Sequence, residues 1–326
     1  MTIRSISLNL LLALSSLFIF FCIAEIVTRL LWHSDVRRQS VGIKLEGPDR
    51  QIIDEGVEYR TNNLGLRMNR EVQPEKRKGV RRILVLGDSF TFGYGLPYED
   101  LVTVKIEKIL NTEMKNIEVV NAGVSGYNTN DELEQLIRLT PACHPDLVTV
   151  FFFTNDVIKE SQDPKKASMR QRIKEYLRVK SKFFAYFYYL YKDRLSSKIG
   201  VPKVFLAPEY FDLDDSKPGW VDFRNATVQI QKHCLQNNMG LLFVMIPTLT
   251  NLDERYPYAE LRKKISNFLK VSNIPVIDLF DLFAPYKPSE LWVNLENTHW
   301  NKLGTTLAAK EVADYIRKKR LLETVQ

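Results

Sequence analysis

Short apolar runs alternate with longer stretches of helical periodicity along most of this chain. The apolar runs at 83–86, 117–120, 147–153, 241–246 and 274–279 are bounded by polar residues, Gly or Pro and predict buried strands. Apolar residues recur every three or four positions in 101–110, 131–139, 221–235, 259–271 and 303–320, which predicts helices. Strands that alternate with helices pair in parallel through right-handed crossovers. The pattern therefore predicts an α/β fold, a three-layer α/β/α sandwich around a five-stranded, flavodoxin-like parallel sheet.

The N-terminus predicts one transmembrane helix ahead of this sandwich. Residues 6–24 carry no charge and would form a helix of roughly 28 Å, about the thickness of a bilayer core. We expect residues 1–32 to be an uncleaved signal anchor in a single-pass membrane protein. The alternative is a cleaved signal peptide, because Cys22 and Ala24 are small residues at a plausible cleavage distance. More arginines follow the span than precede it, and a positive-inside count alone would leave the large domain in the cytoplasm.

Two further regions complete the predicted organisation. Residues 33–81 form a linker and a small lead-in element, in which 59–67 predict a β-turn with Asn63 or Gly65 at positive φ. Residues 82–326 form the main domain, interrupted at about 160–215 by an insertion longer than an ordinary connection. Within this insertion, a helix over 175–193 would carry aromatic residues on nearly all of its faces. The simplest interpretation is a helix buried against the domain; membrane contact and an active-site lid are the alternatives.

Composition narrows the classes of function. The chain has 326 residues, 45% hydrophobic and 26% charged, with a net charge of +7, as expected of a globular protein. The basic clusters at 76–82 and 317–320 are typical of solvated faces and helix ends, so we expect no nucleic-acid partner. The three cysteines, Cys22, Cys143 and Cys234, have no metal-site spacing, and whether the last two pair is left open. We expect no metal and no cofactor.

Candidate chemistry gathers at the ends of the predicted strands. Ser89 follows the first strand, Gly126 the second and Asn155 the third, and His299 lies in the loop after the fifth. Because parallel strands place their carboxyl ends at one edge of the sheet, these residues are predicted to be neighbours. A serine, a histidine and two amides are the parts that acyl transfer needs. Each has an ordinary explanation alone, such as a turn glycine or a helix cap, but their joint placement favours a catalytic site.

These segments resemble the SGNH (GDSL-type) hydrolases, particularly their membrane-anchored bacterial members. The sequence 87–90 (Gly-Asp-Ser-Phe) resembles the family's nucleophile block, and the segments around Gly126, Asn155 and His299 resemble its other three blocks. The resemblance implies Ser89 as nucleophile and His299 as base. It also implies an oxyanion hole built from the Ser89 and Gly126 amides and the Asn155 side chain, and a reaction that needs no metal.

The acid of the triad departs from the family pattern. The family usually has Asp three residues before the histidine, where this chain has Glu296, and related sugar-acetylating members have Asp two before it, where this chain has Asn297. Glu296 is predicted as the acid because it has the usual spacing and the needed charge. A dyad without an acid is the alternative.

The predicted function is that of a serine esterase or O-acyl hydrolase at the cell envelope. Its partner would be an ester-bearing small molecule, glycan or lipid, and the resemblance to anchored members favours an exported, periplasmic or extracellular domain. The alternatives are an O-acyltransferase of envelope or exopolysaccharide biosynthesis and a non-catalytic, glycan-binding domain of the same fold. A nucleotide binder is disfavoured because the chain has no Gly-rich phosphate loop of the usual spacing.

Overall fold

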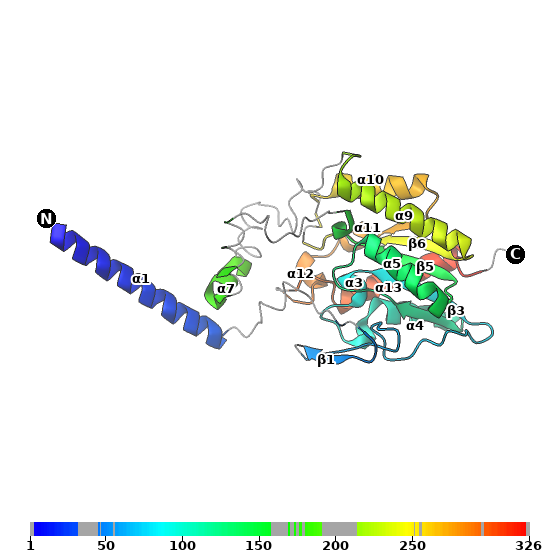
Figure 1. Cartoon of the computed structure of the whole chain (residues 1–326), viewed down its shortest axis with the longest axis horizontal. Helices are drawn as coiled ribbons and strands as arrows, with labels where there is room; N and C mark the ends of the chain where they lie inside the picture. Colours follow the sequence, from blue (N-terminus) through cyan, green and yellow to red (C-terminus); the bar gives the residue numbers. More distant parts are fainter. Residues whose placement is uncertain are drawn as a thin grey trace. The chain divides into compact units, whose positions relative to one another are not determined.

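The computed structural model places the chain in two compact units, which are described separately. Unit 1 comprises residues 1–41 and 161–203, and unit 2 comprises 42–160 and 204–326 (Figure 1). The structure describes residues 3–31, 45, 47–54, 56–157, 169, 173, 176–177, 180–190, 214–250, 252–253, 256–294 and 297–323.

Unit 2 is built on the predicted five-stranded parallel sheet. Its strands are β3 (Arg81–Gly87), β4 (Ile117–Asn121), β5 (Leu147–Phe152), β6 (Gly240–Met245) and β7 (Val276–Asp278). They lie in the order β4-β3-β5-β6-β7, with every neighbouring pair parallel. This is the flavodoxin-like order expected from the sequence, so the prediction of the fold class is confirmed. The carboxyl ends of β3, β4 and β5 consequently meet at one edge.

The interior strand β3, which lies between β4 and β5, shows why the apolar runs are buried on both faces. Ile83 and Val85 belong to one hydrophobic cluster, whereas Leu84 and Leu86 belong to a second cluster on the other face. All four side chains are essentially inaccessible to solvent. Successive strand residues point to opposite faces, so a run apolar at every position needs a layer of helices on each side.

The helices supply those two layers. The first cluster includes residues of α4 (Val102–Glu113) and α13 (Lys302–Lys318), which pack against each other. The second includes residues of α5 (Thr129–Cys143), α9 (Pro218–Gln236) and α10 (Ala259–Val271). Figure 1 shows α5 and α9 side by side across one face of the sheet. Short helical turns complete the unit: α3 (Ser89–Phe92), η1 (Tyr98–Asp100), η2 (Thr154–Val157), α11 (Phe280–Phe283) and α12 (Pro288–Leu291).

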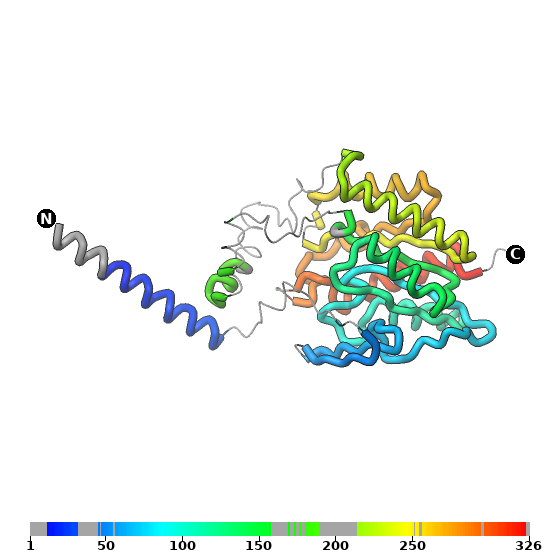
Figure 2. Tube along the Cα trace, viewed as in Figure 1, coloured from blue at the N-terminus to red at the C-terminus, as the bar shows by residue number. Residues whose placement is uncertain are grey.

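The lead-in is more ordered than its sequence predicted. A hairpin of β1 (Gln51–Asp54) and β2 (Val57–Arg60) precedes the predicted turn, and the sequence analysis missed it. Gly65 has φ +74 and therefore takes the positive-φ position, one of the two predicted candidates. The Asn62 side-chain oxygen accepts hydrogen bonds from the Leu64 and Leu66 amides, which closes the turn. Figure 2 shows this lead-in as the blue tube along unit 2.

Unit 1 contains the N-terminal helix α1 (Ile3–Leu31) and the aromatic helix α7 (Lys182–Leu190). Leu12–Leu31 is the one segment among the described residues that is long and apolar enough to cross a membrane, with a mean hydropathy of 2.0. The Glu25 carboxylate of α1 accepts hydrogen bonds from the Ser181 hydroxyl and from the Lys182 and Phe183 amides at the start of α7. The rest of the predicted insertion lies mostly outside the described residues.

The three cysteines are free thiols. Cys143 and Cys234 are both buried in the second cluster and do not form a disulfide, whereas Cys22 on α1 is exposed. Burial raises the pKa of the Cys143 thiol to about 11 and that of Cys234 to about 12, so both are protonated at neutral pH and behave as apolar core residues.

Candidate active site

Ser89 is presented by a tight turn at the end of β3. Gly87 has φ +151, and a Cβ atom there would lie 2.1 Å from Thr91 Oγ1 and 3.1 Å from the Phe151 carbonyl oxygen, so only glycine fits. The Asp88 side chain then caps α3 by accepting a hydrogen bond of 2.8 Å from the Phe90 amide. Asp88 is therefore the N-cap of α3, and Ser89 is the first residue of the helix.

His299 reaches Ser89 from the loop before α13. The distance from Ser89 Oγ to His299 Nε2 is 2.7 Å, between residues 210 positions apart. The ring lies against Phe90, with 4.7 Å between ring centroids, and meets Tyr94 edge-on at 5.4 Å. The next residue, Trp300, is completely buried and donates a hydrogen bond of 3.0 Å to the Phe90 carbonyl. Packing thus fixes the imidazole beside the hydroxyl, as acyl transfer requires.

The partner of the second ring nitrogen is Asn297. Its Oδ1 lies 2.6 Å from His299 Nδ1 and also accepts the His299 backbone N–H at 3.2 Å. An oxygen at this place requires Nδ1 to carry the proton, which leaves Nε2 free to accept the proton of Ser89. Glu296, predicted as the acid, lies outside the described residues, and its role stays a prediction. The sequence analysis had noted Asn297 at the position where sugar-acetylating members have Asp.

The pKa of His299 is set by its burial, which lowers it to about 4. Among the described residues, no carboxylate contributes a shift towards a higher pKa. The imidazole is therefore neutral at pH 7 and able to act as a base.

Gly126 lies in the segment that follows β4, and Asn155 lies in the segment that follows β5, as the sequence predicted. Gly126 has φ +82, and a Cβ there would meet no atom within 4 Å, so its backbone conformation and not close packing calls for glycine. Among the described residues, no hydrogen-bond acceptor is found for the Ser89 and Gly126 amides. The backbone of Asn155 belongs to η2.

Two buried carboxyls lie in the elements that flank this edge. Glu132 on α5 is 1% exposed, and neither of its oxygens has a hydrogen-bond partner among the described residues. Asp156 on η2 accepts the Phe153 amide at 2.9 Å, but its other oxygen is likewise without a partner there. Burial, together with nearby carboxyls that include Asp88, raises the pKa of both groups well above ordinary values. Both are therefore held protonated, which avoids a buried unpaired charge.

Comparisons with known proteins agree with this geometry. A model of the GDSL-like Lipase/Acylhydrolase family matches residues 85–307, a range that includes all four predicted blocks. An arylesterase from Vibrio mimicus is 32% identical over 78 residues, which are 24% of this chain and 39% of that protein.

Solved structures of similar proteins were also found. The crystal structure of TesA is similar over 73% of this chain and 99% of its own, with 15% identity and a TM-score of 0.47. The esterase EstA from Pseudoalteromonas sp. is similar over 74% of this chain and 98% of its own, with 18% identity and a TM-score of 0.45.

We expect Asn297→Asp to raise the pKa of His299, because a carboxylate beside Nδ1 stabilises the imidazolium. NMR titration of the His299 ring protons should give a pKa near 4 in the wild type and a value higher by about 1 to 3 in the variant. Glu296→Gln tests the predicted acid in the same titration: an unchanged pKa would leave Asn297 as the partner of Nδ1. If Glu296→Gln instead lowered the pKa of His299, the carboxylate predicted from the sequence would be its partner after all.

We expect Glu132→Gln to stabilise the protein at alkaline pH. The folded pKa of Glu132 is raised above its unfolded value, so its contribution to stability is fully present below the unfolded pKa and is lost as the pH rises through the folded pKa. Glutamine keeps the shape without this loss. The melting temperature of the variant should match the wild type near pH 4 and exceed it near pH 9. Glu134→Gln, at an exposed position of the same helix, should change neither value.

Proposed function

The chain belongs to the GDSL-like lipase/acylhydrolase family, and we propose that Ser89 and His299 carry out its serine esterase chemistry. The observation that carries the proposal is the 2.7 Å contact between Ser89 Oγ and His299 Nε2. A serine hydroxyl is a weak nucleophile at neutral pH and needs an adjacent base to accept its proton. The neutral His299, with Nδ1–H held by Asn297, is such a base.

The first half-reaction follows from these positions. Ser89 Oγ attacks the ester carbonyl carbon while its proton passes to His299 Nε2, and the carbonyl oxygen becomes an oxyanion. The Ser89 and Gly126 amides, for which no acceptor is found among the described residues, are the proposed donors to that oxyanion. The Asn155 side chain, from the turn after β5, is the proposed third donor. Collapse of the intermediate breaks the bond to the alcohol, which leaves with the proton from His299.

The second half-reaction restores the enzyme. A water molecule attacks the acyl-Ser89 carbonyl carbon and gives a proton to His299 Nε2. The bond to Ser89 Oγ then breaks, His299 returns the proton to Oγ, and the carboxylic acid is released. The same acyl-enzyme could pass its acyl group to a sugar hydroxyl in place of water, which is the acyltransferase alternative. We propose hydrolysis of an ester on a glycan or lipid of the cell envelope as the physiological reaction, because α1 would hold the enzyme at a membrane.

Helix α1 is proposed to be a retained anchor and not a cleaved signal peptide. The support comes from its contacts with α7, more than 150 positions further along the chain. Phe183 packs edge-on against Phe20 and Phe21, with ring centroids 6.4 and 5.8 Å apart, and the Glu25 carboxylate meets the N–H groups at the start of α7. An anion at a helix N-terminus is stabilising. Cleavage near Ala24 would remove the phenylalanines that meet Phe183.

We expect Ser89→Ala to abolish covalent labelling by a fluorophosphonate probe and to lower ester hydrolysis on the order of a thousandfold or more. Acetyl and longer-chain nitrophenyl esters, assayed on the purified chain, give the rates. Ser216→Ala changes an exposed serine outside the site and should retain full labelling. Undiminished labelling of Ser89→Ala would refute the nucleophile. Labelling of the wild type without release of acid, until an acceptor sugar is added, would favour acyl transfer.

We expect the intact chain of 37.9 kDa to stay in the membrane fraction after an alkaline carbonate wash. The matched control begins at residue 42 and should be found in the supernatant. With alkaline phosphatase fused to the C-terminus, activity should appear only if the domain is exported, as proposed. A shorter mature chain in the supernatant would mean that the N-terminal segment is a cleaved signal, and a reporter active only in the cytoplasm would reverse the orientation.

A further inference from the structure

The loop that follows the Ser89 helix forms one wall of the site. Tyr94 meets the His299 ring edge-on at 5.4 Å. A Cβ atom on Gly95 would lie 2.6 Å from Asn297 Nδ2 and 3.0 Å from Val293 Cγ1, so the backbone of this loop packs directly against the His299 loop. Residues 92–96, here called the wall loop, thus contact both the base and the residue that orients it.

An arginine from the lead-in holds the wall loop from behind. The Arg67 side chain is 1% exposed, and its guanidinium donates hydrogen bonds to three carbonyl oxygens, those of Phe92 (2.8 Å), Gly93 and Leu96. The first and the last of these residues delimit the wall loop. A planar guanidinium has five donors in a rigid fork, so one side chain can fix several carbonyls of a turn together.

The charge of Arg67 is stabilised by aromatic faces and not by a carboxylate. The guanidinium carbon lies 4.2 Å from the centroid of Tyr59 and 5.2 Å from that of Phe92, and these two rings stack nearly parallel. Among the described residues no carboxylate lies within ion-pair distance of Arg67. Burial lowers its pKa to about 10, so the group remains charged at neutral pH. Burying a charge is costly unless the charged group is hydrogen-bonded. For Arg67, the hydrogen-bond acceptors are the carbonyl oxygens of the wall loop.

The lead-in contributes a second contact to the same loop. The Tyr59 hydroxyl accepts a hydrogen bond of 2.8 Å from the Gly95 amide. Tyr59 comes from β2 and Arg67 from the turn region that follows it, so two lead-in residues fix successive parts of one loop.

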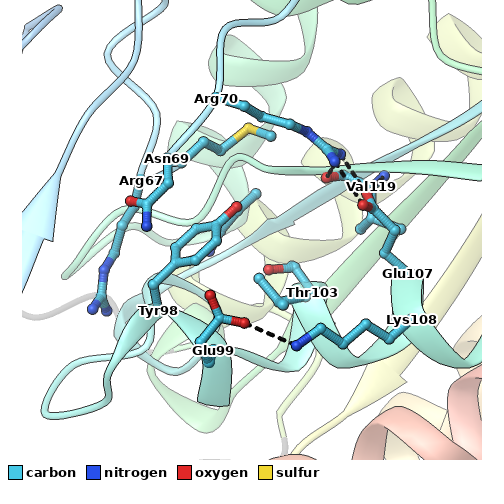
Figure 3. Close-up of a pocket in the computed structure, with 12 residues that line it drawn as sticks. Arg67, Asn69, Arg70, Tyr98, Glu99, Thr103, Glu107, Lys108 and Val119 are labelled. Carbon is cyan, nitrogen blue, oxygen red and sulfur yellow. Dashed lines mark hydrogen bonds and ion pairs between the residues drawn. The ribbon is translucent and has the colours of Figure 1, made fainter.

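A neighbouring arginine provides a contrast. Arg70 belongs to the same lead-in, but its side chain is 44% exposed and pairs with Glu107 of α4. Figure 3 shows Arg67 and Arg70 on different sides of a pocket of about 260 Å³, with Arg70 directed to Glu107 and Val119. Arg70 therefore ties the lead-in to α4 without touching the wall loop.

We propose that Arg67 is a positioning residue for the active site, whose guanidinium fixes the wall loop against His299 and Asn297. The lead-in is then a working part of the enzyme and not only a connection to the anchor. The inference rests on the proposed function for its kinetic readout, but its spectroscopic readout depends on the structure alone.

The test is Arg67→Lys in the full chain, with Arg70→Lys as the matched control. Lysine keeps the positive charge but has a single nitrogen, which cannot span the carbonyls of Phe92 and Leu96 as the fork does. A loosened wall loop admits water to the imidazole, so the pKa of His299 should rise from about 4 towards the ordinary value of roughly 6.5. NMR titration of His299 should show this rise, and the acid limb of kcat/KM should move with it.

The kinetic effect should fall mainly on kcat, with a loss of about ten- to a hundredfold and little change in KM, because a displaced base affects the transition state more than substrate binding. Arg70→Lys should leave both the titration and kcat unchanged, even if it melts earlier. Should Arg67→Lys fail to fold, Tyr59→Phe removes the hydroxyl that accepts the Gly95 amide and should shift the titration in the same direction by less.

Three outcomes separate a positioning role of Arg67 from a purely structural one and from a failure of the proposed function. A folded Arg67→Lys protein with wild-type titration and kcat would overturn the proposal and leave Arg67 a purely structural residue. Equal shifts in Arg67→Lys and Arg70→Lys would also overturn it, because the effect would then follow from general destabilisation. If no ester is hydrolysed by the wild type, the proposed function fails, whereas the His299 titration still tests Arg67.

Discussion

The hydrogen bond between Ser89 and His299 is the interaction for which most of the fold is needed. Its two residues are 210 positions apart, so the nucleophile and its base come from opposite ends of the domain sequence. Parallel pairing of β3 with β4 and β5 brings the Gly126 and Asn155 segments to the Ser89 edge. The final helix α13 packs on α4 as well as on α11 and α12, and so holds the loop that precedes it at the same edge. A change that shifted this packing by an ångström would lengthen the contact on which proton transfer depends.

The sequence could predict the sheet and the positions of Ser89, Gly126 and His299, because strands buried on both faces leave a continuous apolar run and topology then decides which ends meet. It could not choose between Glu296 and Asn297. The two are adjacent, and only the path of the turn decides which side chain reaches Nδ1. Spacing favoured Glu296, which lies outside the described residues and stays a prediction; among the described residues the Asn297 oxygen is the one beside Nδ1. The hairpin of β1 and β2 was missed for a related reason. Each of its strands has four residues, of which one is buried, and so short a pattern shows little periodicity.

Arg67 could not have been singled out from the sequence at all. The chain has 46 lysines and arginines, and nothing in the local sequence separates Arg67 from the exposed Arg60 and Arg70. What distinguishes it is tertiary: two stacked rings and three carbonyls of one loop surround it. Long side chains with apolar stems are compatible with either a solvated or a buried place, and only the packing around them decides which is realised.

Burial determines the charge state of several ionisable groups around the site. Burial raises the pKa of Glu132 and Asp156 and lowers that of His299, so each of the three is held in its neutral form at pH 7. Arg67 keeps its charge, because a pKa of about 10 still lies well above neutrality. Because Glu132 and Asp156 are neutral, neither of them opposes a developing oxyanion at the site. The positive charge of Arg67 lies behind the wall loop. In a medium of low dielectric constant such an arrangement matters more than in water, because the field of each remaining charge and dipole is less screened. The Asn297 oxygen beside Nδ1 has a comparable effect, because it fixes the tautomer of His299 without the rise in pKa that a carboxylate at this place would cause.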